Sequence, residues 1–142
     1  CRFHFYINAS AAVAAPVKNS EGKLMLVTRG VEPDLGKLDL PGGFVDHHET
    51  IENALKRELD EELGLKVKSM QYTGSAPNEY VFSDFTVFTV DMAFEVEAET
   101  LENLHSHDDI SDFRFYAEGE FSYEDIPASS MKLFVKQFFS KK

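Results

Sequence analysis

The sequence of 142 residues is long enough for one compact domain with a hydrophobic core and too short for two ordinary domains. Hydrophobic residues make up 43% and aromatic residues 13%, which is enough apolar surface to offset chain entropy and excludes disorder over most of the length. The formal net charge of −11 would repel a phosphate backbone, so we expect no nucleic acid among the partners.

Hydrophobic periodicity and turn residues predict strands with one helix between them and another at the end. In chain order the expected elements are strands at 9–17, 23–28 and 38–40, a helix at 50–63, strands at 66–74, 80–96 and 113–116, and a helix at 129–139. Thr50 is the expected N-cap of the first helix and Gly64 its stop. Asn78 marks the expected turn between the two long strands. This order predicts an α/β sandwich with a mixed β-sheet.

The single cysteine, Cys1, allows neither an internal disulfide nor a zinc site completed by cysteines within the chain. This composition is typical of a reducing compartment, and we expect a cytoplasmic location. No apolar run approaches the roughly eighteen residues of a membrane span, because the run at 9–17 is short and Lys18 follows it. We therefore expect no membrane partner.

The acidic residues fall into two blocks. Seven lie between Asp46 and Glu62, and twelve more lie between Asp91 and Asp125. Such blocks are either solvated surface or ligand sets for hard divalent cations, which prefer carboxylate oxygens. For the first block, the spacing of the acids decides between these alternatives. We interpret the second block, with the exception of Asp109, as solvated surface.

The first block has a fixed spacing. Gly43 is followed by five residues and Glu49, then by seven residues and Arg57, which Glu58 follows directly and, after two more residues, Glu61 and Glu62. Residues three and four apart share a helix face, so the last three carboxylates crowd together and repel one another. Bound Mg²⁺ or Mn²⁺ would neutralise them.

Residues 43–65 meet every fixed position of the Nudix box, and the sequence therefore resembles the Nudix hydrolase family. The resemblance implies a Nudix-type α/β/α sandwich that acts as a magnesium-dependent pyrophosphohydrolase. Its substrate would be a small nucleotide, a nucleoside diphosphate linked to another moiety: a dinucleotide, a nucleoside diphosphate sugar or a nucleoside triphosphate. The implied metal ligands are Glu58, Glu61, Glu62 and the carbonyl of Gly42.

The resemblance also implies the catalytic groups. Arg57 would pair with Glu49 and the glutamates, and an acid before a late strand, here Asp109, would help to bind metal or activate water. A solvated loop acid is the alternative for Asp109, and Glu61 or Glu62 would then accept the proton. A Nudix-fold sensor that binds a nucleotide without turnover is the alternative function, with the box as an exposed ion-pair network.

The substrate residues are less specific. Arg29 is a candidate for a terminal phosphate, and Phe44, Asn78 and Tyr80 are candidates for a base or ribose, with packing or turn structure as the alternative for each. Many family members dimerise, so a homodimer is an expectation too. Isopentenyl diphosphate isomerases share the fold but need a catalytic cysteine within it, which this chain lacks.

The NADH pyrophosphatase branch of the family offers a partial match. Its segment after the box is echoed at Ser75 and Pro77, although the tryptophan of that segment is missing. This branch carries a four-cysteine zinc ribbon before its Nudix domain, and Cys1 resembles the last ligand of such a ribbon. Residues 1–8 would then be the remnant of the ribbon and 9–142 the Nudix domain, with Zn²⁺ expected only in that case. A chance terminal cysteine is the alternative.

Overall fold

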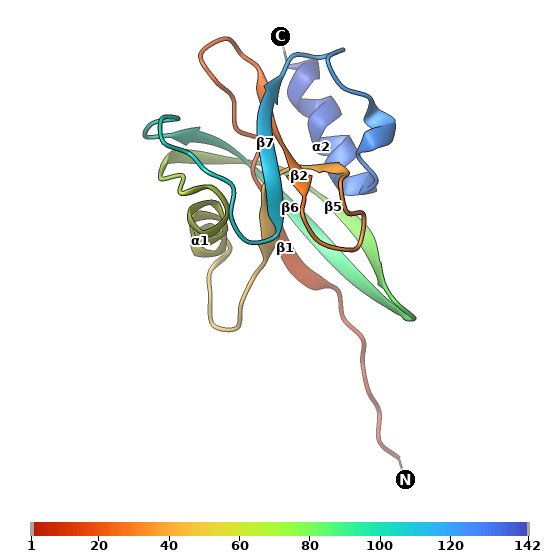
Figure 1. Cartoon of the computed structure of the whole chain (residues 1–142). Coiled ribbons are helices and arrows are strands. Elements are labelled where there is room, and N and C mark those ends of the chain that lie inside the picture. The colour runs from red at the N-terminus through yellow and green to blue at the C-terminus, as the bar shows by residue number, and fades with distance from the viewer. Residues whose placement is uncertain (1, 142) are drawn as a thin grey trace.

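The computed structural model describes residues 2–141, which form two layers of sheet flanked by helices (Figure 1). The elements are β1 (Ser10–Ala14), β2 (Leu24–Arg29), β3 (Leu38–Asp39), β4 (Gly42–Phe44), α1 (Ile51–Leu63), β5 (Val67–Phe82), β6 (Phe85–Ala98), β7 (Ile110–Tyr116), a short 3₁₀ helix (Tyr123–Asp125) and α2 (Ser129–Ser140). Cys1, and with it the expected zinc ligand, lies outside the described residues.

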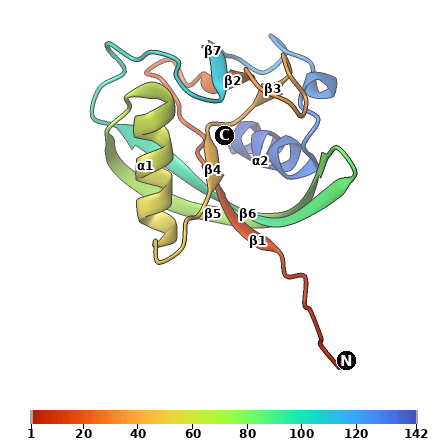
Figure 2. The same cartoon turned by 60° about the horizontal axis from the view of Figure 1, so that its bottom comes forward.

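Four strands form one sheet in the order β4-β1-β6-β5, and three form a second sheet in the order β3-β2-β7. β1 and β6 run parallel, with Ser10 opposite Thr89, whereas every other pair is antiparallel. The first sheet is therefore mixed, as the sequence predicts. Figure 2 shows α1 and α2 on opposite sides of the central strands.

Two hydrophobic clusters fix this layering. Successive side chains of a strand point to opposite faces, so Val13 packs into the cluster beneath α1 and Ala14 into the cluster beneath α2. Met25 and Leu26 of β2 divide in the same way. The expected α/β/α sandwich is confirmed.

The sequence signals of α1 are also confirmed. The hydroxyl of Thr50 accepts a hydrogen bond from the amide of Asn53 at 3.1 Å, and Gly64 ends the helix with φ of 67°. The leucine stripe, Leu55, Leu59 and Leu63, is fully buried. The helix therefore presents one apolar face to the core, and its Glu58 and Glu62 side chains lie against the glycines of β4.

Three expectations require correction. The turn predicted at Asn78 is wrong, because β5 runs unbroken to Phe82 and the turn falls at Ser83 and Asp84. Pro77 does not end the strand, since β5 is at the sheet edge, where a missing N–H is tolerated. β7 begins at Ile110, earlier than position 113. Asp91 is fully buried and accepts a hydrogen bond from Ser130, so the second acidic block is not all solvated.

Neither α1, with 13 residues, nor α2, with 12, is long enough to cross a bilayer, and the described part of the chain holds no helix that is.

Candidate active site

The turn before α1 brings the backbone of β4 against the acidic face of that helix. A side chain at Gly43 would collide with the carboxylate of Glu58, and one at Gly42 would collide with the Val13 carbonyl across the sheet. The amide of Gly42 donates a hydrogen bond of 3.0 Å to Glu62 Oε1. Close approach of the backbone therefore requires glycine at position 42, whereas a side chain at position 43 would displace the Glu58 carboxylate, so the turn packs against two of the three glutamates.

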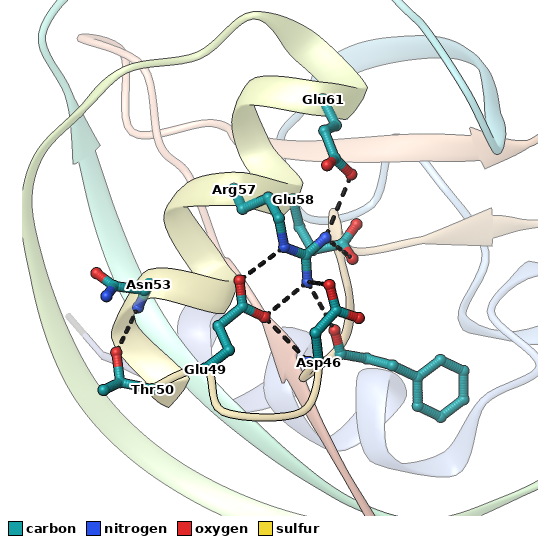
Figure 3. A network of polar contacts seen from close by, with 8 residues as sticks. Asp46, Glu49, Thr50, Asn53, Arg57, Glu58 and Glu61 are labelled. Atoms are coloured by element: carbon teal, nitrogen blue, oxygen red, sulfur yellow. Dashed lines mark hydrogen bonds and ion pairs between the residues drawn. The ribbon is translucent and has the colours of Figure 1, made fainter.

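Arg57 is the centre of a polar network that ties the loop to the helix (Figure 3). Its guanidinium donates two hydrogen bonds to Glu49, at 2.7 and 2.9 Å, and one of 3.0 Å to the carbonyl of Phe44. It also donates to Glu58 at 2.9 Å and to Glu61 at 3.2 Å. Only a planar fork with several N–H groups makes this set of contacts.

The network sets the charge states of its members. Hydrogen bonding from Arg57 lowers the pKa of Glu49 to about 2, and the same hydrogen bonds raise the pKa of the Arg57 guanidinium. Both groups therefore stay charged at neutral pH, and the ion pair holds the loop in place.

The pKa values of Glu62 and Glu58 shift in the opposite direction to that of Glu49. Glu62 is 5% exposed, and burial raises its pKa to about 9. Burial also raises the pKa of Glu58. The charge of Asp109 further raises the pKa of both groups, and that of Glu58 raises the pKa of Glu62, so this part of the site is short of positive charge.

These groups line a cavity of about 370 Å³ between α1, β4, β5 and the loop before β7. Glu58, Glu62 and Asp109 are on its wall. The amide of His107 donates to the carbonyl of Glu62 at 2.8 Å, and the amide of Gly30 donates to the carbonyl of Asp109 at 2.7 Å. These backbone bonds fix the acidic loop against α1 and β2, which places Asp109 beside the box glutamates.

The expected substrate residues divide. Arg29, Phe44 and Tyr80 line the cavity, and the rings of Phe44 and Tyr80 meet edge to face at 6.4 Å. Asn78 is absent from the lining: it is buried, and its side chain accepts a hydrogen bond of 3.2 Å from Ser129.

One cavity residue, Asp39, is not predicted from the sequence. Its carboxylate accepts a hydrogen bond of 3.1 Å from Arg29, whose Nε also donates to the Pro33 carbonyl at 2.7 Å. Burial outweighs the neighbouring guanidinium and raises the pKa of Asp39 to about 6. The sequence signal for Asp39 is its position: it is an acidic residue in a two-residue strand shortly before the two glycines.

Glu61 lies apart from the other two box glutamates that line the cavity. Its side chain is about half exposed and pairs with Arg57, whose guanidinium occupies the space between Glu58 and Glu61. Among residues 2–141, no three histidine, cysteine, aspartate or glutamate side chains converge closely enough to hold a metal ion. The expected ligand triad is therefore not assembled around one point, and part of its repulsion is offset by Arg57.

The donor set still fits a hard cation. Glu58, Glu62 and Asp109 offer only oxygen atoms and line the same cavity, and burial, with a smaller contribution from the neighbouring carboxylates, raises the pKa of Glu62 to about 9. A bound divalent ion would supply the missing positive charge.

Fold and site together define an α/β/α protein with an acidic loop–helix motif facing a polar cavity. The family model of the NUDIX domain matches residues 8–138, so the chain belongs to the Nudix hydrolase family. This confirms the family to which the box points.

Three similar proteins show the range of the family match. An ADP-ribose pyrophosphatase from Methanocaldococcus jannaschii is 38% identical over 79 residues, which cover 54% of this chain and 46% of that protein. An NAD-capped RNA hydrolase NudC from Deinococcus radiodurans is 37% identical over 82 residues, 49% of this chain and 29% of that protein. The chain thus spans less than half the length of either relative. A NUDIX hydrolase crystal structure from Nitrosomonas europaea has a TM-score of 0.76 at 22% identity, covering 100% of this chain and 76% of that one.

Proposed function

We propose that this chain is a divalent-metal-dependent hydrolase that cleaves the pyrophosphate bond of a nucleoside diphosphate linked to another moiety. The observation that carries the proposal is that Glu58, Glu62 and Asp109 line one cavity, which the cationic side chain of Arg29 also lines. An anionic substrate enters such a cavity productively only when cations offset the carboxylates. The box residues Glu58 and Glu62 are the ligands we propose for those cations.

Glu58, Glu62 and the carbonyl of Gly42 would hold Mg²⁺, with Glu61 joining if it leaves Arg57. When bound, Mg²⁺ polarises phosphoryl oxygens and lowers the pKa of a water molecule. Arg57 positions Glu58 and, through Glu49, the loop after β4. Arg29, held in place by Asp39, is available to orient a phosphate.

Asp109 is the favoured acceptor for the proton of the attacking water. It lines the same cavity as the box glutamates, and its loop is fixed by backbone hydrogen bonds to Glu62 and Gly30. Glu62 is the second candidate, but with a pKa of about 9 it keeps its own proton at neutral pH unless a cation compensates its burial.

Phe44 and Tyr80 are the candidates for contact with a ring of the substrate. Both line the cavity, whose volume of about 370 Å³ is within the ordinary range for small-ligand sites. The relatives named an ADP-ribose pyrophosphatase and an NAD-capped RNA hydrolase support an ADP-ribose or NAD-type dinucleotide as the substrate class.

A hydrolysis panel tests the proposal. ADP-ribose, NADH, a nucleoside diphosphate sugar and a nucleoside triphosphate are incubated with the chain and Mg²⁺, and products are identified by mass. We expect Glu62→Gln to lower kcat by about 10²–10⁴-fold and Asp109→Asn by a smaller factor of about 10–10². Asp60→Asn is the matched control, because Asp60 is on the same helix and its exposed side chain pairs with Lys66.

Two results would contradict the proposal. Near-normal turnover in Glu62→Gln would remove the box from the mechanism. Tight binding of one of these nucleotides without any turnover, with Mg²⁺ present, would favour the sensor function instead.

A further inference from the structure

A buried polar cluster joins the start of α2 to the two long strands. Ser130, in the first turn of α2, donates a hydrogen bond to the carboxylate of Asp91 on β6, and both side chains are buried. The preceding residue, Ser129, donates a hydrogen bond of 3.2 Å to Asn78 on β5. Two consecutive residues of one helix are therefore tied to two neighbouring strands.

The first turn of α2 has no capping side chain of its own. Its N-cap residue is Ala128, which makes no side-chain hydrogen bond, and the turn contains no acidic residue. The carboxylate of Asp91 lies at this end of the helix, where the helix dipole favours negative charge. A strand thus supplies the acid that the helix lacks.

The Asp91–Ser130 pair fixes a position more than it adds stability. Burial raises the pKa of Asp91, and the hydrogen bond from Ser130 opposes that shift. An apolar side chain of similar size would fill the same space without the cost of burying a carboxylate. A buried carboxylate tolerates only an arrangement that gives it a donor, so it selects one placement of the first turn of α2.

The cluster adjoins the wall of the cavity. Met131, the residue directly after Ser130, lines the cavity. Ala12 also lines it, and Ala12 is the residue opposite Asp91 in the pairing of β1 with β6. A shift of the first turn of α2 would therefore move a side chain of the cavity wall.

Tyr80 connects the cluster to the side chains proposed for the substrate ring. It is two residues from Asn78, on the same face of β5, and it lines the cavity. Burial, and then the charges of Asp39 and Asp91, raise the pKa of its phenol, so the phenol is near both acids. Asp91 is thus close to a residue expected to meet the substrate.

We propose that Asp91 is a positioning residue for the ring of the substrate: through Ser130 it holds the first turn of α2 so that Met131 stays at the cavity wall. The effect on substrate rests on the function proposed above, whereas the placement of Met131 does not. The glutamates proposed as metal ligands are on α1, on the opposite side of the central strands (Figure 2). The placement should therefore change KM and leave kcat almost unchanged.

A variant that keeps its stability but loses the pair tests this role. Asp91→Leu combined with Ser130→Ala replaces the pair by apolar side chains, and we expect it to be as stable as the wild type in urea denaturation. With ADP-ribose and Mg²⁺, its KM should rise about tenfold while kcat stays within about threefold. A merely structural role would leave KM unchanged in a variant of equal stability.

Three further variants complete the comparison. Asp91→Asn still offers an oxygen to Ser130 and should keep KM within about threefold of the wild type. Ser140→Ala is the matched control, because that hydroxyl donates within α2, to the carbonyl of Gln137. If the double variant does not fold, Ser130→Ala removes the same hydrogen bond by the loss of one atom and should raise KM in the same way.

Methionine methyl resonances test the placement without turnover. The chain has four methionines, and Met131→Leu identifies the ¹³C-methyl signal of Met131. We expect the double variant to shift or broaden this signal, whereas the signal of Met25, which packs in the cluster beneath α1, should stay in place. An unchanged Met131 signal, or an unchanged KM in the folded double variant, would overturn the proposal. A chain that hydrolyses no nucleotide would contradict the proposed function alone, and the Met131 signal would still decide whether Asp91 places that residue.

Discussion

Arg57 has the largest set of polar contacts in the candidate site, and a conservative change tests its role. Lysine has the same charge but one point-like donor group, so it cannot bind Glu49, Glu58 and the Phe44 carbonyl together. We expect Arg57→Lys to lower the free energy of unfolding by about 2 kcal/mol and turnover at least tenfold. Urea denaturation and steady-state kinetics measure the two effects.

The adjacent Lys56 is exposed on the same helix and provides the control. Lys56→Gln removes a charge without touching the network, and we expect it to change stability by no more than about 0.5 kcal/mol. Equal effects of the two substitutions would show that the charge of the helix matters and the fork does not.

Asp39 gives a pH-dependent prediction. Its pKa rises from 3.8 to about 6 on folding, so the folded state holds the proton more tightly than the unfolded state does. As pH rises from 4 to 7, the ionisation of Asp39 should therefore cost the wild type on the order of 3 kcal/mol relative to Asp39→Asn. The stability difference between the two proteins, measured by urea denaturation in EDTA from pH 4 to 8, should move in favour of the variant as pH rises.

A difference that does not change with pH would mean that the Arg29 ion pair compensates the burial of Asp39 fully. A shift toward the wild type would mean that the pair is net stabilising. Either result would contradict the raised pKa of Asp39.

At the scale of single residues, the sequence predicts which side chains carry the chemistry better than it predicts where those side chains point. Spacing placed three carboxylates on one helix face, but an offset of one residue turns a side chain by about 100°, so Glu62 enters the cavity while Glu61 pairs with Arg57 near solvent. Asn78 and Tyr80 are two residues apart and share a face of β5, but Asn78 is buried and bonded to Ser129 of α2, whereas Tyr80 lines the cavity.

Gly64, which ends α1, lies close to His105 of the acidic loop. Gly64 has φ of 67°, and a Cβ there would lie 2.7 Å from the His105 ring. We expect Gly64→Ala to cost about 1–2 kcal/mol for the left-handed backbone, and more for the displaced imidazole. Thermal unfolding monitored by circular dichroism measures the loss.

Gly22 is a matched control, because its φ is 77° and a Cβ there meets nothing within 4 Å. Gly22→Ala should lose only the stability that the left-handed backbone costs. The difference in stability loss between the two variants is therefore the free-energy cost of moving His105. Identical losses would show that the loop adapts freely, and the close packing of His105 on α1 would then not hold the loop that carries Asp109.

Elements with local signals were predictable, and those defined by tertiary context were not. Thr50, the leucine stripe and Gly64 specify α1 within its own sequence. The turn between β5 and β6 has weak local signals at Ser83 and Asp84, and Pro77 and Asn78 resemble a turn more strongly. Only the edge position of β5 and the burial of Asn78 against α2 reveal that the strand continues.

At the scale of the whole molecule, the acidic residues behind the net charge of −11 lie in three kinds of environment. Some acids are solvated, as expected from the acidic loops, some form the box network, and a few are buried, including Glu62, Asp39 and Asp91. Composition predicted the excess but not the burial, since a buried acid is identified only by what packs around it. The burial of Glu62 and Asp39 beside one cavity concentrates negative charge where a cation would bind.

This distribution predicts a specific response to Mg²⁺. An ion that binds the folded state alone stabilises it by RT ln(1 + [L]/Kd), which is about 2.7 kcal/mol at a hundredfold excess over Kd. We expect millimolar Mg²⁺ to raise Tm by several degrees above the value in EDTA, and NaCl of equal ionic strength to raise it less, because screening acts on all charges alike.

Glu58→Gln separates the two contributions, because it removes one cavity carboxylate while the exposed acids that respond to screening remain. The variant should lose the increment specific to Mg²⁺ and retain the response to NaCl, whereas Asp60→Asn, which changes an exposed acid of the same helix, should retain both. Equal responses of all three proteins to Mg²⁺ and NaCl would mean that the cavity binds no cation, and the acidic cavity wall would then have to be explained without a metal.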